Sequence, residues 1–279
     1  MEFTTEQMEY YKKQGWLSVP TVFSEKEISA VQAEISALTS ANLPGSVFEN
    51  DGKTLRALHG CHQINQVLHC LTMHPSFLEP VKQLLNSEVY VHQFKVNFKS
   101  SFSGDLWQWH QDYVFWHKED EVPAPRMISV SLFLDEVNEF NGPIYLIPGS
   151  HQYGILCDEI QPASLDTSVK SDWTINFSTS LKFTVRNRVV SQLVNKHGIL
   201  APKGPRGTVL FLHSNLVHSS APNISPYNRN LLFITYNSVE NKPQSKISKK
   251  QRPEFLVSRD YTPLSSVAED TILKMALPR

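Results

Sequence analysis

Hydrophobic residues in the first ninety positions recur at helical spacing. Ser24 and Glu27 stand three residues apart, which is the spacing of a capping box at the start of a helix. Hydrophobic residues then follow at intervals of three and four, at Ile28, Val31, Ile35 and Leu38. Residues 75–85 repeat this pattern and predict another helix. Residues 42–66 have weak periodicity, and we expect a loop region near the site there.

From residue 89 the hydrophobic pattern changes to an alternation typical of strands. One face of residues 89–99 would carry Tyr90, His92, Phe94, Val96 and Phe98, and the other Gln93, Lys95, Asn97 and Lys99. Further strands are expected at residues 127–134, 143–147, 181–185, 207–212 and 231–237. Helices followed by many short strands predict an α+β fold, mainly β with a helical layer, on a double-stranded β-helix core of the jelly-roll or cupin type.

Length and charge narrow the class of protein. A chain of 279 residues fits one domain, in which helices of residues 1–88 pack on a jelly-roll core of residues 89–260. The net charge of −1 argues against a nucleic-acid partner. The polar, acidic first residues are not those expected of a signal peptide, and the sequence contains no apolar run long enough to cross a membrane. We therefore expect a small-molecule substrate as the partner, and a homodimer is compatible with these features.

The three cysteines bear on the compartment and on the metal chemistry. Cys61, Cys70 and Cys157 cannot all pair with one another, and none belongs to a Cys-x-x-Cys motif. This usage is typical of a reduced cytoplasmic protein and argues against a zinc–thiolate site.

Candidate chemistry lies in two histidines, a carboxylate and an arginine. His110 and Asp112 are two residues apart, His218 follows about a hundred residues later, and Arg229 lies eleven positions further. Two histidines and one carboxylate are the ligands of non-haem Fe(II) oxygenases, which leave coordination positions open for a cosubstrate and O2. An arginine beside such a site suits a ligand that carries its own carboxylate.

Spacing alone leaves competing assignments open. A chain with 11 histidines and 27 acidic residues is expected to contain about one His-x-Asp/Glu triplet by chance, and His117-Lys118-Glu119 is a second one here. Extended backbone would point His110 and Asp112 to the same side. The strand at residues 207–212 would deliver either His213 or His218 at its end, beside the antiparallel strand that Arg229 opens.

The segment Trp109-His-Gln-Asp-Tyr-Val-Phe-Trp116 and its continuation to Pro123 resemble the signature of ectoine-hydroxylase-like enzymes of the phytanoyl-CoA dioxygenase superfamily. Residues 14–20, 141–151, 207–237 and 252–259 are also similar to that family. The resemblance implies an enzyme that uses Fe(II), 2-oxoglutarate and O2. It also implies iron ligation by His110, Asp112 and His218, and 2-oxoglutarate contacts from Arg229, Lys99, Asn97 and Ser220.

The resemblance also implies a substrate pocket and shows where this chain departs from the family. Pocket positions match Gln93, Trp116, Ser129 and Arg252. Next to the metal, where ectoine hydroxylases carry Phe followed by an acidic and a hydroxyl residue, this chain has Tyr113, Val114 and Phe115. We expect these three residues to bind substrate and to make the pocket more apolar.

Three hypotheses on function follow. The preferred one is hydroxylation of an unactivated C–H bond in a free amino acid, cyclic imino acid or ectoine-like metabolite. Hydroxylation is favoured over halogenation because related halogenases lack the carboxylate that Asp112 supplies. A second is oxidation of a larger apolar substrate such as an acyl thioester or terpenoid. A third is a binding module that kept the fold without catalysis.

Overall fold

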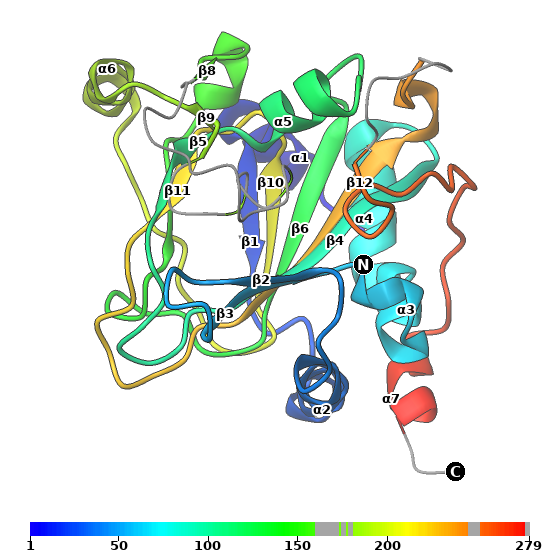
Figure 1. Ribbon diagram of the computed structural model, residues 1–279. Coiled ribbons are helices and arrows are strands. Elements are labelled where there is room, and N and C mark those ends of the chain that lie inside the picture. The colour runs from blue at the N-terminus through cyan, green and yellow to red at the C-terminus, as the bar shows by residue number, and fades with distance from the viewer. Residues whose placement is uncertain (160–172, 174–176, 178–180, 245–251, 277–279) are drawn as a thin grey trace.

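Two antiparallel sheets face each other in a computed structural model that describes residues 1–159, 173, 177, 181–244 and 252–276 (Figure 1). The large sheet has seven strands, in the order β1 (Trp16–Val19), β10 (Val209–His213), β6 (Met127–Phe133), β12 (Leu231–Ser238), β4 (Val89–Asn97), β3 (Leu55–His59) and β2 (Ser46–Phe48). The small sheet consists of β5 (Trp107–His110), β11 (His218–Ser220) and β7 (Ile144–Leu146). A separate two-stranded ribbon joins β8 (Asp158–Glu159) and β9 (Phe183–Thr184).

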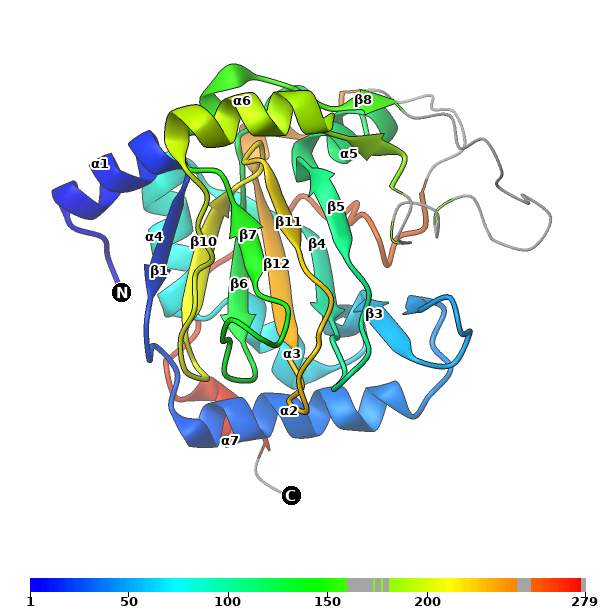
Figure 2. The same cartoon turned by 90° about the vertical axis from the view of Figure 1, so that its left-hand side faces the viewer.

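Helices cover the face of the large sheet that points away from the small one. Figure 1 shows α3 (Gln66–Thr72) and α4 (Pro75–Leu85) on this face, with α7 (Thr271–Ala276) below them. The helix α2 (Glu25–Thr39) runs along one end of the sandwich, and α5 (Asp112–Glu119) and α6 (Asn187–His197) lie at the opposite end (Figure 2). The N-terminal α1 (Thr5–Gln14) precedes the edge strand β1. The fold is thus the expected α+β jelly roll.

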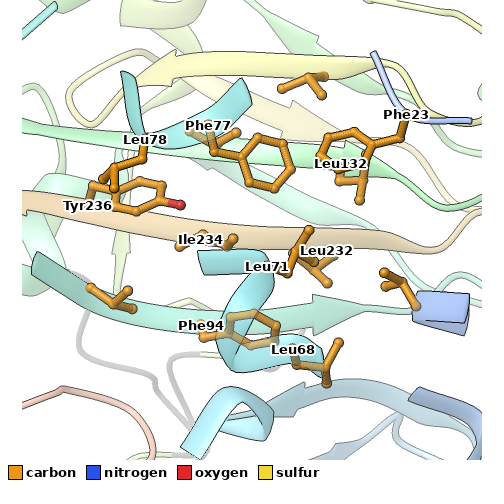
Figure 3. Packing of buried hydrophobic residues seen from close by; sticks show 14 of the residues in the cluster. Phe23, Leu68, Leu71, Phe77, Leu78, Phe94, Leu132, Leu232, Ile234 and Tyr236 are labelled. Carbon is orange, nitrogen blue, oxygen red and sulfur yellow. The ribbon is translucent and has the colours of Figure 1, made fainter. Parts of the chain in front are cut away.

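Two apolar cores hold these layers together. Between the helices and the large sheet, Phe77, Leu78 and Leu71 pack on Leu132, Leu232, Ile234 and Phe94 (Figure 3). Between the two sheets, Ile144 and Leu146 of β7 meet inward-facing residues of β6, β10 and β12, among them Phe133, Leu210 and Phe233. Burial of so much apolar surface is the main source of stability. The site is therefore built on a rigid scaffold.

The predicted cap of α2 is confirmed. The Ser24 backbone N–H donates to Glu27 Oε2 at 2.8 Å, and the Glu27 N–H donates to Ser24 Oγ at 3.4 Å. Ile28, Val31 and Ile35 are the buried positions of the helix.

The expectation of a loop over residues 42–66 is wrong. This segment contains the hairpin β2–β3, the 3-10 turn Cys61–Gln63 and the start of α3. Together with β1, these strands also make the N-terminal region less helical than its hydrophobic pattern suggested. Short edge strands bury few side chains in regular alternation, so their sequence signal is weak.

The alternation predicted for residues 89–99 is correct only in its second half. The pairing of β4 with β12 shifts register between Thr235 and Tyr236, which leaves His92 as the extra residue of a β-bulge. As a result, Val89 and Val91 join Phe94 and Val96 in the helix-side core. Gln93, Lys95 and Asn97 alternate with Phe94 and Val96, and so point toward the small sheet.

Among the helices that the structure describes, none has the length and apolar character needed to cross a membrane.

Candidate active site

Three side chains that could hold a metal ion meet where the two sheets open toward α5. His110 ends β5, Asp112 begins α5, and His218 begins β11, which pairs with β5 so that His218 stands opposite His110. Their candidate ligand atoms all lie within 4.8 Å of one another. His110 Nε2 is 3.6 Å from Asp112 Oδ1, and the two imidazole rings lie 4.2 Å apart.

Backbone carbonyls orient both imidazole rings. His110 Nδ1 lies 2.6 Å from Gln108 O, and His218 Nδ1 lies 3.0 Å from Leu216 O. A hydrogen bond to a carbonyl requires the proton on Nδ1, which leaves Nε2 of each ring with a free lone pair. This is the usual way in which a protein fixes the tautomer of a metal-binding histidine. The donor set thus fits one divalent metal ion.

Asp112 reaches the site from the first turn of a helix, which corrects the expectation of an extended segment through His110 and Asp112. The turn between them is held by Gln111, a fully buried side chain. Gln111 Nε2 donates to Gly154 O and Asn215 O at 2.8 Å, and Gln111 Oε1 accepts from Leu156 N at 2.6 Å.

The electrostatics of the cluster favour an ionised Asp112 carboxylate and a neutral His218 imidazole. Burial tends to raise the pKa of Asp112, but the charge of Lys95 and the contacts with His110 and His218 outweigh burial and hold that pKa well below its usual range. Burial, together with His110, lowers the pKa of His218 to about 4. Metal ligands need these protonation states, because a protonated group cannot bind the ion.

The residues that competed with these three as metal ligands make other contacts. His213 packs its ring 4.8 Å from that of His151, and its Nδ1 accepts from Asn215 N. His117 Nδ1 lies 2.9 Å from Val122 O, and Glu119 forms ion pairs with Lys182 and Arg252. Within the described part of the chain, His110, Asp112 and His218 form the only cluster suited to a metal.

A second polar group of residues lies between the sheets, at the start of β12. Arg229 is buried, and its Nη2 donates to Gly142 O at 2.6 Å. Arg229 Nε, Ser220 Oγ and Asn97 Oδ1 are all buried and have no hydrogen-bond partner in the described structure. Buried polar atoms are rarely left unpaired. A bound ligand that offers carboxylate oxygens would satisfy the hydroxyl and the guanidinium.

Lys99 adds a second buried cation to this group. Its Nζ donates to Asp105 O at 2.8 Å and to Ala221 O. Burial, with a smaller effect of Arg229, lowers the pKa of Lys99 to about 6, and burial lowers the pKa of Arg229 to about 9. In both cases burial disfavours the charged form, which a bound anion would stabilise. The four residues expected to contact 2-oxoglutarate therefore fit a dianionic cosubstrate.

A cavity adjoins the metal cluster on the side of β4 and α5. Its lining residues are Gln93, Lys95, Trp107, His110, Asp112, Phe115, Trp116, Phe177, Leu181 and Arg252. Sequence reasoning did not single out four of them: Lys95, Trp107, Phe177 and Leu181. Lys95 could have been found, because it alternates with Gln93 and Asn97 on β4. Phe177 and Leu181 carry no local signal, since only the tertiary fold brings them to the site.

Comparison with known proteins identifies the family. The sequence pattern of the phytanoyl-CoA dioxygenase (PhyH) family matches residues 11–231. The chain belongs to this family. It is 37% identical over 262 residues to an L-proline trans-4-hydroxylase of Streptomyces griseoviridis, with 94% of this chain and 95% of that protein covered. It is 33% identical over 265 residues to an ectoine dioxygenase of Bordetella bronchiseptica, with 92% and 82% covered.

A solved structure agrees with this assignment. EctD from S. alaskensis with 2-oxoglutarate and 5-hydroxyectoine superposes with a TM-score of 0.77 at 27% identity, covering 95% of this chain and 87% of that one. Family membership and the His110–Asp112–His218 cluster identify the protein as an Fe(II)- and 2-oxoglutarate-dependent dioxygenase.

The four residues at positions that match the family's substrate pocket make different contacts. Gln93 lines the cavity and donates from Nε2 to Leu256 O at 3.0 Å. Trp116 also lines it, with its ring packed edge-on against His92. Arg252 lines it as well, but two acidic residues bind its guanidinium. Ser129 lies deeper on β6, where its Oγ contacts Thr235 Oγ1 at 3.1 Å.

The expectation that Tyr113, Val114 and Phe115 all bind substrate requires correction. Phe115 lines the cavity and packs edge-on near His110. Tyr113 instead packs against Trp116, Val122 and Met127, and Val114 is buried in a cluster beside β9. Because the segment is helical, residues three and four positions after Asp112 share its face and the two in between do not. Tyr113 and Val114 therefore do not line the cavity.

Proposed function

We propose that this PhyH-family dioxygenase hydroxylates a ring carbon of a free imino acid of the L-proline type. The observation that carries the proposal is the cavity itself, which joins aromatic walls to charged and amide groups directly beside His110 and Asp112. A small saturated ring with a charged head group matches such a lining. The L-proline trans-4-hydroxylase, at 37% identity over nearly the whole chain, supports the same substrate class.

The aromatic residues of the cavity would position the substrate ring. Trp107 comes from β5, Phe115 and Trp116 from α5, and Phe177 from a third segment, and each is less than one-tenth exposed. They would exclude water from the space next to the metal and restrict the orientation of a small ring. Restricting a substrate to a reactive orientation is a large part of enzymatic rate enhancement.

The ligand atoms of the site suggest which residues would bind the metal and which would bind the cosubstrate. Bound Fe(II) and 2-oxoglutarate supply oxidative decarboxylation, in which one atom of O2 enters succinate and the other enters the substrate as a hydroxyl group. His110, Asp112 and His218 would hold the metal, and Arg229, Lys99, Ser220 and Asn97 would bind the cosubstrate. Asp112 would occupy one coordination position of the metal, which supports hydroxylation rather than halogenation.

The larger apolar substrate that the sequence left open is less well supported. An acyl thioester or terpenoid would have to bury the ammonium group of Lys95 against carbon, and burial of a charged group in apolar surroundings is costly. The non-catalytic alternative is disfavoured because the metal cluster and the buried arginine are complete.

A substrate panel tests the proposal. The purified protein is incubated with Fe(II), 2-oxoglutarate, ascorbate and L-proline, other imino and amino acids, or ectoine, and mass spectrometry detects the gain of one oxygen atom. We expect L-proline or a close analogue to be hydroxylated. His110→Ala should abolish substrate-dependent succinate formation, whereas His69→Ala, at an exposed position, should retain it. Full turnover by the His110 variant would refute the ligand assignment.

We further propose that the chain works as one domain of residues 1–279 in the cytoplasm, on small molecules rather than nucleic acids or membranes. The three free cysteines and the near-neutral net charge support this view. The homodimer stays a prediction, which light scattering coupled to size-exclusion chromatography can test.

A further inference from the structure

A buried arginine, Arg56, lies behind the cavity and belongs neither to the metal cluster nor to the cosubstrate residues. It is the extra residue of a β-bulge, because the pairing of β3 with β2 skips it between Leu55 and Ala57. A regular strand would point Arg56 away from the face that carries Ala57. The bulge instead lets the side chain reach the start of β5 in the small sheet, where only 1% of the residue is exposed.

Each nitrogen of the Arg56 guanidinium contacts a different segment of the chain. Nε donates to Phe177 O at 2.7 Å, and Nη2 donates to Leu106 O at 2.9 Å. Nη1 forms an ion pair with Glu49 Oε2 at 2.9 Å. The planar guanidinium holds these donors in a fixed fork, which the single ammonium group of a lysine cannot reproduce.

The flat face of the guanidinium covers the ring of Trp107. Arg56 Cζ lies 4.0 Å from the ring centroid, which is a cation–π contact. Trp107 and Phe177 both line the cavity, and the Trp107 ring lies 6.4 Å from that of His110. Arg56 therefore holds two walls of the cavity from outside, without lining the cavity itself.

Glu49 compensates the charge of Arg56 and extends the same network. Glu49 Oε1 accepts from Asp105 N at 3.1 Å, in the segment that leads into β5. Burial lowers the pKa of Arg56, and the charge of Glu49 counteracts this shift. Buried ion pairs contribute little net stability compared with apolar residues of similar size. The fixed geometry that the pair imposes on its neighbours is therefore its more informative property.

We infer that Arg56 is a positioning residue, which fixes Trp107 and Phe177 so that the substrate keeps one orientation toward the metal. This inference rests on the proposed function and extends it to a residue outside the cavity. With loosened walls, the substrate carbon would be misplaced. 2-Oxoglutarate would still be oxidised to succinate and CO2, but ascorbate in the assay would reduce the second oxygen atom to water. Succinate would then exceed hydroxylated product.

Arg56→Lys tests the inference, because it keeps the positive charge and loses the planar fork. With L-proline, Fe(II), 2-oxoglutarate and ascorbate, we expect about one succinate per hydroxyproline from the wild type and about three or more from the variant. The KM for L-proline should rise about 3- to 10-fold. The absorbance change that 2-oxoglutarate causes in the Fe(II)-loaded protein without O2 should saturate at the same concentration in both.

Glu49→Gln is a milder second variant. It keeps an acceptor oxygen for Arg56 but removes the ion pair. We expect it to raise the ratio of succinate to hydroxyproline less than Arg56→Lys does. This variant also tests the inference if Arg56→Lys does not fold.

Near-UV circular dichroism tests the same contact without substrate, since it reports how rigidly aromatic rings are packed. Arg56→Lys should lower the near-UV signal while the far-UV spectrum stays the same. The loss should largely disappear when Arg56→Lys is made in a Trp107→Phe background, because the ring that Arg56 covers is then absent.

The matched control is Arg206→Lys. Arg206 also bonds a backbone carbonyl, Leu134 O at 3.2 Å, and a carboxylate, Glu25 Oε2 at 2.9 Å. It lies against α2, which runs along the end of the sandwich opposite α5 (Figure 2). Its replacement should change neither the ratio of succinate to hydroxyproline nor the near-UV spectrum.

Two results would overturn the inference. An unchanged ratio in Arg56→Lys and Glu49→Gln would leave Arg56 with a contribution to stability only, measurable in urea. Weaker binding of 2-oxoglutarate at an unchanged ratio would assign Arg56 to the cosubstrate site. Failure of the proposed function is distinguishable, because the wild type itself would then hydroxylate no imino acid, while the near-UV comparison would still show whether Arg56 fixes Trp107.

Discussion

Lys99 and Arg229 place two basic side chains in a region from which water is excluded. Both side chains are at most 2% exposed, and their hydrogen bonds go to backbone carbonyls rather than to carboxylates. Such an arrangement is unfavourable by itself, because desolvation of each cation is not repaid by an opposite charge. A bound dianion would offset this cost, so we expect these residues to favour a dicarboxylic cosubstrate.

Gly142 allows the two cations to approach each other. Its φ is +74°, and a Cβ at this position would lie 2.6 Å from Ala221 O and 2.9 Å from Lys99 Cδ. Gly142 O is also the acceptor for Arg229 Nη2. Only glycine combines this backbone conformation with such close contacts.

Gly142→Ala should therefore destabilise the protein and weaken cosubstrate binding together. We expect a loss of about 2–4 kcal/mol in the free energy of unfolding, from left-handed strain and overpacking, and a higher KM for 2-oxoglutarate. Gly52→Ala is the matched control, because Gly52 has a φ of +68° and open space around its Cβ position. Urea denaturation of both variants distinguishes the strain of a left-handed backbone, which both alanines would have, from steric crowding, which only Gly142→Ala introduces. Equal losses in the free energy of unfolding would contradict this explanation.

At the scale of elements, the junction between β5 and α5 decides the geometry of the metal cluster. His110 closes a strand, Asp112 opens a helix, and buried Gln111 ties the turn to Gly154, Leu156 and Asn215. The His-x-Asp spacing predicted that both ligands face the metal, but it did not reveal a helix start. A helix of eight residues with a weak apolar periodicity leaves little trace in the sequence.

Replacement of Gln111 tests this junction. Gln111→Leu preserves volume but removes three hydrogen bonds to backbone groups, so we expect a loss of about 2–4 kcal/mol in stability. Iron affinity should fall by about 10- to 100-fold, because the turn that orients two ligands is loosened. Gln152→Ala, at an exposed position, should change neither quantity appreciably. An unchanged iron affinity in Gln111→Leu would show that the turn does not position the ligands.

Strand β4 shows which side-chain orientations could be predicted from the alternation of the sequence and which could not. Alternation of polar and apolar residues placed Gln93, Asn97 and Lys99 on one face of the strand, and in the structure Gln93 and Asn97 face the interior between the sheets. The bulge at His92 could not be predicted, because it depends on the partner strand β12. Resemblance to the family implied which residues contact the cosubstrate, whereas Phe177 and Leu181 reach the cavity through tertiary packing alone.

In the whole molecule, the main apolar core and the active site lie on opposite faces of the large sheet. The apolar core between the helices and the outer face of the large sheet carries no residue of the site, as Figure 3 illustrates with Phe77, Leu132 and Ile234. The opposite face supplies Gln93, Lys95 and Asn97 to the space between the sheets. Substrate contacts can therefore change among PhyH-family members without loss of the helical layer.

The central claim is that the chain couples 2-oxoglutarate oxidation to hydroxylation of an L-proline-like imino acid. The most direct test is the stoichiometry of succinate and hydroxylated product, measured in one reaction by mass spectrometry with 18O2. We predict one succinate for each hydroxyproline, with one 18O atom in each product. Succinate formation at the same rate with and without imino acid, and with no oxygen gained by any member of the panel, would contradict the claim.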